Sequence, residues 1–144
     1  VCDIGAPQWI LLDGDKIAAL MAMLLQQELA ASGLSESFNS AVIQTAYANG
    51  ASTAFIHSLG MPIYMAKTGV KYLHHKAKEF DVGVYFEANG HGTVVFSERF
   101  VQAVEEYVPT SADGKNRKDI AYARLKASIK LINPAVGDAL SDML

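Results

Sequence analysis

The segment VYFEANGHG, residues 84–92, ends a predicted buried strand with three hydrogen-bonding side chains, Glu87, Asn89 and His91. The pair Asn89-Gly90 is sufficient for a tight hairpin turn, but a turn requires neither the carboxylate nor the imidazole. Glutamate accepts hydrogen bonds and asparagine both accepts and donates them, which together suits neighbouring hydroxyls of a sugar. His91 could anchor a further oxygen. The segment therefore predicts a polar ligand-binding loop, with a plain hairpin turn as the alternative.

A second candidate is the triplet Lys67-Thr68-Gly69, which follows a predicted strand over residues 63–66. A lysine at the carboxyl end of a strand can reach a phosphate or a hydroxyl. Gly69 lets backbone N–H groups approach a ligand closely, because glycine has no side chain. Taken alone, an ordinary turn is the simpler interpretation of these three residues.

Two other groups resemble metal sites only superficially. Asp13-Gly14-Asp15 offers two carboxylates, but no third acid follows at the spacing of a calcium loop and Lys16 lies next to them. We interpret it as a turn in which Asp15 caps a helix. His74 and His75 are adjacent, and adjacent residues of a helix diverge by about 100°, so the pair is read as helix surface or core edge. The sequence predicts no metal site.

Nucleophilic and phosphate-binding motifs are weak. The chain has no G-x-S-x-G motif, and Cys2 is its only cysteine. The segment NGAST, residues 49–53, could present helix N–H groups to an anion, but it lacks the Gly-Lys-Ser/Thr ending of a P-loop. An ordinary turn before a helix is the preferred interpretation.

Hydrophobic periodicity predicts strands that alternate with helices. The predicted strands cover residues 9–12, 41–45, 63–66, 82–86 and 93–96, and the predicted helices cover residues 16–31, 53–59, 70–79 and about 121–132, the last stopped by Asn133-Pro134. This order indicates an α/β fold with a mixed, mostly parallel sheet that is flanked by helices and ends in an antiparallel pair. Ligands of such sheets bind at the carboxyl ends of the strands, where the turns at residues 13–15, 48–52, 67–69 and 87–92 would meet. The helix over residues 16–31 is apolar around most of its circumference, so we expect it to be packed on more than one side.

Composition limits the classes of function. The chain has 144 residues, of which 51% are hydrophobic, which fits one globular domain. Its net charge of −3 argues against a nucleic-acid or anionic-membrane partner, and no apolar run reaches the roughly 18 residues of a membrane helix. A single cysteine fits a reducing, cytoplasmic compartment. The chain lacks a starting Met and a signal peptide and ends inside a helical pattern, so we expect a piece of a longer protein.

Four segments resemble a known family: QTAYANGAST, KTGVKYLHHKAKEFDVGVYFEANGHGTVVFS, LLDGDKIAAL and GDALSDML. They are similar to the N-acetylglucosamine branch of the α-D-phosphohexomutase family, over nearly the whole chain. The resemblance implies a single sugar-binding domain over residues 1–144, with a short lead-in at residues 1–12. This would be the third of four domains.

The resemblance also implies a reaction. A phosphoserine of the first domain and a bisphosphorylated sugar would interconvert N-acetylglucosamine 6-phosphate and N-acetylglucosamine 1-phosphate. Mg²⁺ would be bound by the second domain, and the fourth would hold the non-reacting phosphate. The partners would be N-acetylglucosamine phosphates and the other domains of the same chain. This chain alone would hold no cofactor and be inactive.

The family's sugar-binding pattern, Glu-x-Ser-Gly-His, matches residues 87–91. The match implies that Glu87 and Asn89 bind the hydroxyls at C3 and C4, with His91 close to the phosphate or the reacting oxygen. Asn89 in place of serine matches the N-acetylglucosamine branch. A mutase of glucose or mannose phosphates and a non-catalytic interaction module that kept the fold are the alternatives.

The family's Thr-Gly loop matches Thr68 and Gly69, with Lys67 beside them. Some bacterial relatives carry a histidine where this chain has Val70 and a lysine near the position of Gln44. The resemblance therefore does not assign a general acid or base here, and a proton-transfer role for Lys67 or His91 is only one possibility.

Overall fold

The centre of the fold is a four-stranded mixed sheet of order β2-β1-β3-β4. The computed structural model describes residues 10–111 and 116–132. The strands are β1 (Ser40–Gln44), β2 (Ile63–Met65), β3 (Val82–Phe86) and β4 (Gly92–Phe96). β1 pairs in parallel with β2 and β3, and β3 pairs antiparallel with β4. The predicted α/β class and the antiparallel closing pair are therefore confirmed.

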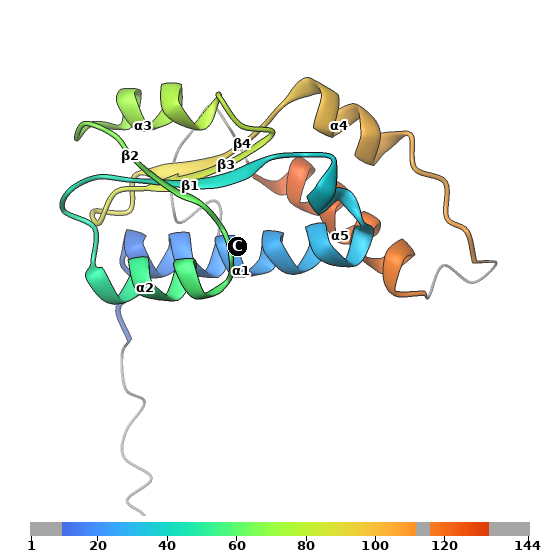
Figure 1. Cartoon of the computed structure of the whole chain (residues 1–144), viewed down its shortest axis with the longest axis horizontal. Helices are drawn as coiled ribbons and strands as arrows, with labels where there is room; N and C mark the ends of the chain where they lie inside the picture. Colours follow the sequence, from blue (N-terminus) through green and yellow to red (C-terminus); the bar gives the residue numbers. More distant parts are fainter. Residues whose placement is uncertain (1–9, 112–115, 133–144) are drawn as a thin grey trace, which may run out of the picture.

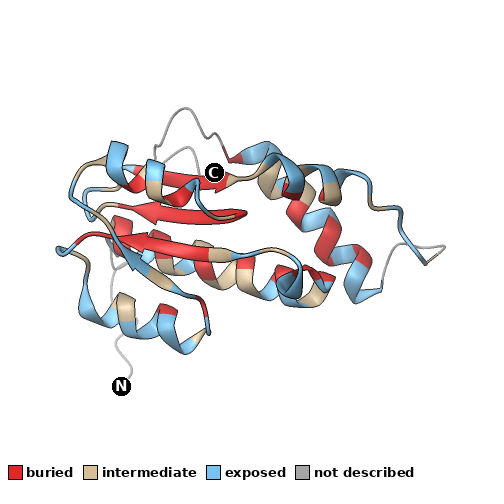
Figure 2. Ribbon diagram, turned by 45° about the horizontal axis from the view of Figure 1, so that its top comes forward, coloured by how far each residue is buried: buried red, intermediate tan, exposed pale blue. Residues whose placement is uncertain are grey.

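Helices cover both faces of this sheet (Figure 1). The helices are α1 (Gly14–Ser32), α2 (Gly50–Ser58), α3 (Val70–Ala77), α4 (Glu98–Glu105) and α5 (Arg117–Leu131), with a short 3-10 helix η1 (Leu34–Glu36). α1 and α2 lie on one face and α3 lies on the other. β1, β3 and β4 are almost entirely buried, whereas the edge strand β2 and the outer helix surfaces are largely exposed (Figure 2).

Alternating strand residues supply two separate apolar cores, because successive side chains of a strand point to opposite faces. Val42 and Val84 belong to the larger core, on the α1 side, together with Leu25. Ile43 and Tyr85 belong to the smaller core, under α3. The sheet is thus covered on both sides, as a mostly parallel sheet requires.

α1 packs against the sheet, α2 and α5, which confirms that it is packed on more than one side. Its predicted cap was wrong. Asp13, not Asp15, is the N-cap, since Asp13 Oδ1 accepts a hydrogen bond from the backbone N–H of Lys16 at 3.0 Å. Asp15 lies buried in the first turn. The helix ends at Ser32, and Gly33 is its C-cap.

Other element boundaries also needed correction. Residues 10–12 form no strand and are largely exposed, because this short apolar run has no pairing partner in the sheet; Trp9 lies outside the described residues. α2 begins at Gly50, earlier than predicted, because the side chain of Asn49 caps it by accepting from Ala51 N–H at 2.9 Å. α3 ends at Ala77, before the predicted end at residue 79. α5 begins at Arg117, ahead of the apolar periodicity that starts at Ala121. Residues 112–115 and the predicted stop at 133–134 lie outside the described residues.

α4 was not predicted from the sequence. Ser97 caps it by accepting a hydrogen bond from Phe100 N–H at 3.2 Å. Only Phe100 and Val104, one turn apart, are buried, so its apolar stripe is very narrow. Among the described residues, no helix has the length and apolar character to cross a membrane.

Candidate functional site

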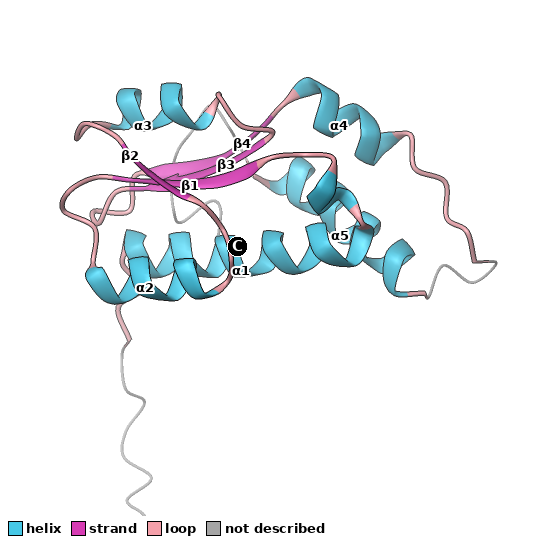
Figure 3. Cartoon of the chain, viewed as in Figure 1, coloured by secondary structure: helices cyan, strands magenta, loops and turns pink. Residues whose placement is uncertain are grey.

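Two loops that lie far apart in the sequence meet at the carboxyl end of the sheet (Figure 3). We call residues 87–91, between β3 and β4, the tip loop, and residues 66–69, between β2 and α3, the Lys67 loop. The backbone N–H of Gly69 donates a hydrogen bond to Glu87 Oε1 at 2.9 Å. The structure therefore joins one predicted site residue of each loop directly.

This contact changes the role that Gly69 can have in ligand binding. Its N–H is engaged by the Glu87 carboxylate, so Gly69 orients that carboxylate instead of offering this N–H to a ligand. Glu87 is half-buried, and Gly69 is the one hydrogen-bond partner of its side chain within the described ranges. A carboxylate has about four lone-pair sites, so Glu87 keeps acceptor capacity for a ligand.

The tip loop holds its shape through its own backbone. Glu87 N–H donates to the carbonyl of His91 at 2.7 Å, and Gly90 N–H donates to the carbonyl of Glu87 at 2.8 Å. Asn89 Oδ1 accepts from His91 N–H at 2.9 Å. Gly90 has a φ of 93°, which residues with a side chain rarely adopt. The amide oxygen of Asn89 thus builds the turn, and its exposed NH₂ group remains as a donor.

Helix α1 supports the tip loop from below, which sequence reasoning missed. Gly14 N–H donates to the carbonyl of Ala88 at 3.2 Å. A Cβ at Gly14 would lie 1.7 Å from the carbonyl oxygen of Glu87, so only glycine fits at this contact. The one sequence signal was a glycine between two aspartates, and it was interpreted as a turn.

Glu87 and Asn89 therefore form an acceptor and donor pair on a rigid support. Lys67, Thr68 and His91 are exposed around it. Within residues 10–111 and 116–132, Lys67 forms no ion pair and the imidazole of His91 has no hydrogen-bond partner. The geometry fits hydroxyl recognition by Glu87 and Asn89, and it does not select Lys67 or His91 as a proton-transfer group.

Buried polar groups lie at the carboxyl end of β1 and the start of α1. Gln44 is 2% exposed and its Oε1 accepts from Thr53 Oγ1 at 2.9 Å. Its Nε2 is the one buried side-chain nitrogen or oxygen atom without a partner in the part of the chain that is described. Burial raises the pKa of Asp15, and a hydrogen bond from the backbone of Asn49 opposes that rise. Gln44 and Asp15 thus each accept a hydrogen bond from the start of α2, Gln44 from Thr53 and Asp15 from the backbone of Asn49.

The described residues contain no group of three or more histidines, cysteines or acids that could hold a metal ion. Lys16 Nζ donates to Asp13 Oδ2 at 2.9 Å, so that carboxylate is already paired. The Nδ1 atom of His74 lies 3.0 Å from the hydroxyl of Tyr85, and burial lowers the pKa of this histidine. Cys2 lies outside the described residues.

Comparison with known proteins identifies the family. A family model described as "Phosphoacetylglucosamine mutase AMG1, domain III" matches residues 13–144. The chain belongs to this family. The phosphoacetylglucosamine mutases of Homo sapiens and Mus musculus are 52% and 51% identical to it, each over 93% of this chain and 24% of the relative. The chain spans about a quarter of the length of these curated relatives.

Solved structures agree with this assignment. The structure of the Aspergillus fumigatus N-acetylphosphoglucosamine mutase in complex with GlcNAc-6P and magnesium superimposes with a TM-score of 0.84 at 47% identity, over 93% of this chain and 26% of that one. A substrate complex of an N-acetylglucosamine-phosphate mutase, a member of the α-D-phosphohexomutase superfamily, gives a TM-score of 0.82 at 45% identity, over 92% of this chain and 24% of that one. The fold is therefore that of a phosphohexomutase domain.

Proposed function

We propose that this chain is the sugar-recognising domain of a phosphoacetylglucosamine mutase, an isomerase that interconverts N-acetylglucosamine 6-phosphate and N-acetylglucosamine 1-phosphate. The observation that carries the proposal is the Glu87 carboxylate, fixed by Gly69 N–H beside the exposed amide of Asn89. The family match and a related structure that contains GlcNAc-6P support the choice of sugar.

In the proposed mechanism this domain holds the sugar ring while phosphoryl groups exchange at its two ends. Glu87 accepts a hydrogen bond from one ring hydroxyl, and the amide of Asn89 donates to its neighbour. A charged acceptor strengthens such a bond, because hydrogen bonds to ionised groups are about twice as strong as neutral ones. Lys67, Thr68 and His91 contact the phosphate or the remaining oxygens, and Gly69 keeps Glu87 in position.

The groups that transfer the phosphoryl group belong, in this proposal, to the rest of the longer protein. Mg²⁺, which would offset charge on that group, is bound by another domain, since the described residues of this chain do not fit it. Residues 1–144 form one domain with a lead-in at residues 1–12, and the isolated chain has no mutase activity. A cytoplasmic location stays a prediction that rests on the single cysteine.

The test uses the full-length protein that carries this domain, assayed with N-acetylglucosamine 1-phosphate. Glu87→Ala is expected to lower kcat/KM by about 10- to 100-fold, because a hydrogen bond to a charged group is worth roughly 1.5–3 kcal/mol. Glu87→Gln keeps an acceptor for Gly69 N–H and loses the charge, so a smaller loss is expected. Glu98→Gln, an exposed glutamate at the start of α4, is the matched control.

Unchanged kcat/KM in Glu87→Ala, at wild-type melting temperature, would refute the role of Glu87. An inactive wild-type protein would favour the interaction module. Higher kcat/KM with glucose or mannose phosphates than with the N-acetylglucosamine phosphate would favour a mutase of glucose or mannose phosphates.

A further inference from the structure

Ion pairing leaves an uneven distribution of free cations on this domain. Four cations form salt bridges with acids in the described residues: Lys16, Lys76, Arg99 and Arg124. Lys67, Lys71 and Lys78 are exposed and form no ion pair within the same residues. The other cations without an ion pair in these residues, Arg117, Lys118, Lys126 and Lys130, lie on α5. Of the two groups, only the lysines of α3 and its preceding loop begin beside the candidate site.

Two of these lysines lie on one side of the helix. Lys71 and Lys78 are seven residues apart, which is close to two turns, so they project from the same face about 10 Å apart. Leu73 and Ala77 are buried against the sheet. Lys67 lies in the loop before α3, two residues ahead of Gly69. We call Lys67, Lys71 and Lys78 the α3 lysine stripe.

The stripe begins at the candidate site. α3 starts one residue after Gly69, whose N–H holds the Glu87 carboxylate. Residues 67–80 contain four lysines and one glutamate, although the whole chain carries a net charge of −3. That glutamate, Glu79, is already paired with Lys76 at 2.6 Å.

Exposed acids without an ion pair are found on α4. Glu98 and Glu105 are exposed on α4, and neither forms an ion pair in the part of the chain that the structure describes. α4 follows the end of β4, at the opposite end of the sheet from the tip loop (Figure 1). The α3 side therefore carries a local excess of unpaired positive charge, and α4 carries exposed acids.

We propose that the α3 lysine stripe attracts the anionic sugar phosphate and raises its concentration at the tip loop, without contacting the bound sugar through Lys71 or Lys78. The inference rests on the proposed function, which supplies the anion. A phosphate monoester carries a charge of about −1.5 to −2 at pH 7. Such attraction acts over about 30 Å at 0.01 M salt and only about 8 Å at 0.15 M salt, so its effect must fade as salt is added.

The test compares two double variants of the full-length protein, assayed with N-acetylglucosamine 1-phosphate at ionic strengths from about 10 mM to 300 mM. Lys71→Gln with Lys78→Gln removes the distal part of the stripe and leaves Lys67 in place. Arg117→Gln with Lys130→Gln is the control, because these exposed cations of α5 also lack an ion pair within the described residues. Both variants change the net charge equally.

The stripe variant is expected to lose about 3- to 10-fold in kcat/KM at low salt, at the lower end of the range for electrostatic steering. The loss should shrink to less than about 1.5-fold at high salt, with kcat and the melting temperature unchanged. The control variant should match wild type at every salt concentration.

Three results would overturn the inference: no loss at low salt, a loss that persists at high salt, or an equal loss in the control. A persistent loss would indicate direct contact, and an equal loss would indicate net charge alone. An inactive wild-type protein would instead defeat the proposed function, and with it this inference, so the two failures are distinguishable.

Discussion

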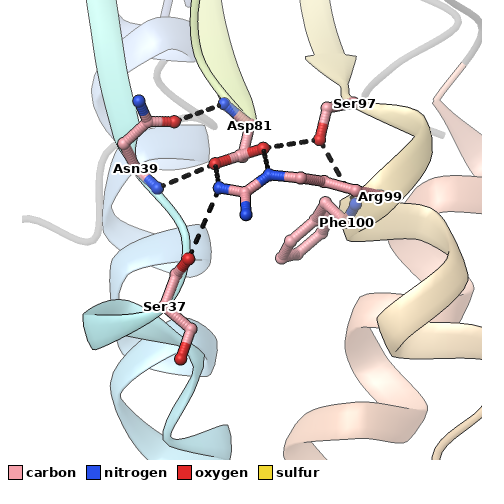
Figure 4. A network of polar contacts seen from close by, with 6 residues as sticks. All are labelled: Ser37, Asn39, Asp81, Ser97, Arg99 and Phe100. Carbon is pink, nitrogen blue, oxygen red and sulfur yellow. Dashed lines mark hydrogen bonds and ion pairs between the residues drawn. The ribbon is translucent and has the colours of Figure 1, made fainter.

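Two carboxylates flank β3, one at each end of the strand, and their hydrogen bonding differs. At the amino end, Asp81 accepts hydrogen bonds from Asn39 N–H at 3.1 Å, from Ser97 Oγ at 2.7 Å and from two nitrogens of Arg99 (Figure 4). At the carboxyl end, Glu87 accepts one, from Gly69 N–H. Asp81 is 5% exposed, whereas Glu87 is half-buried. A saturated carboxylate fixes structure, and an unsaturated one keeps acceptor capacity for a ligand.

The saturated end also ties several elements together. Asn39 Oδ1 accepts from Asp81 N–H at 2.8 Å, which joins the approach to β1 with the approach to β3. Arg99 comes from α4, and its guanidinium lies 4.7 Å from the ring centroid of Phe38. The hydrogen bond from Arg99 is the largest cause of the lowered pKa of Asp81. We expect changes at this end to alter stability and changes at the tip loop to alter binding.

Replacement of Asp81 should have the largest effect on stability. Asp81→Ala removes the buried acceptor of four part-buried hydrogen bonds, so we expect a loss of about 2–4 kcal/mol in the free energy of unfolding. Urea denaturation of the chain measures this loss. Glu98→Ala, on the exposed side of α4, should cost less than about 0.5 kcal/mol. Equal losses in the two variants would contradict the structural role of Asp81.

Gly14 tests the link between the tip loop and the core. Gly14→Ala places a methyl group against the carbonyl of Glu87 and should cost about 1–3 kcal/mol through overpacking. Denaturation and hydrogen exchange at the Gly90 amide would report the loss. Gly50→Ala is the matched control, since it also begins a helix and a Cβ there meets nothing within 4 Å. A neutral Gly14→Ala would show that α1 does not support the loop.

Low pH should remove the stabilisation of the fold that the Asp81 carboxylate provides. Its pKa is lowered in the folded state, so its contribution is complete above the ordinary value of 3.8 and is lost as the pH falls through the folded pKa. The difference in unfolding free energy between wild type and Asp81→Asn, about 1–2 kcal/mol at pH 7, should therefore shrink steadily below pH 4. Urea titrations at pH 7, 4 and 3 would measure it. A difference that does not depend on pH would contradict the ion pair.

The smallest effect on stability is expected at the tip loop itself. Asn89→Ala removes one exposed hydrogen bond to His91 N–H, so the free energy of unfolding should change by less than about 0.5 kcal/mol. The affinity of the full-length protein for N-acetylglucosamine 1-phosphate should fall several-fold, as measured by calorimetry. A large loss of stability with unchanged affinity would reverse the comparison between the two ends.

Sequence patterns predicted most of the sheet because buried strands and their turns leave local signals. Residues 82–86 were placed correctly, and β1 and β4 were placed to within one residue at each end. α4 was missed because its buried stripe is only Phe100 and Val104 among charged residues. Residues 10–12 were wrongly predicted as a strand, since hydrophobicity alone does not supply a pairing partner.

The candidate site shows the same limit. The residue types at Glu87 and Asn89 indicated a polar binding loop without any structure. The contact between Gly69 and Glu87, and that between Gly14 and Ala88, could not be read from the sequence, because they join segments distant along the chain. The sequence interpretation gave Gly69 a part in letting backbone N–H groups approach a ligand, and it did not foresee that the N–H of Gly69 itself donates to Glu87.

The contact at Gly14 has a mechanical consequence. α1 begins directly after Asp13, and the N–H of its first residue, Gly14, donates to the tip loop. The two backbones are in contact here, because Gly14 has no side chain. We therefore expect a displacement of the first turn of α1 to move Ala88 and its neighbours as well. The shape of the tip loop then depends on the position of the start of α1.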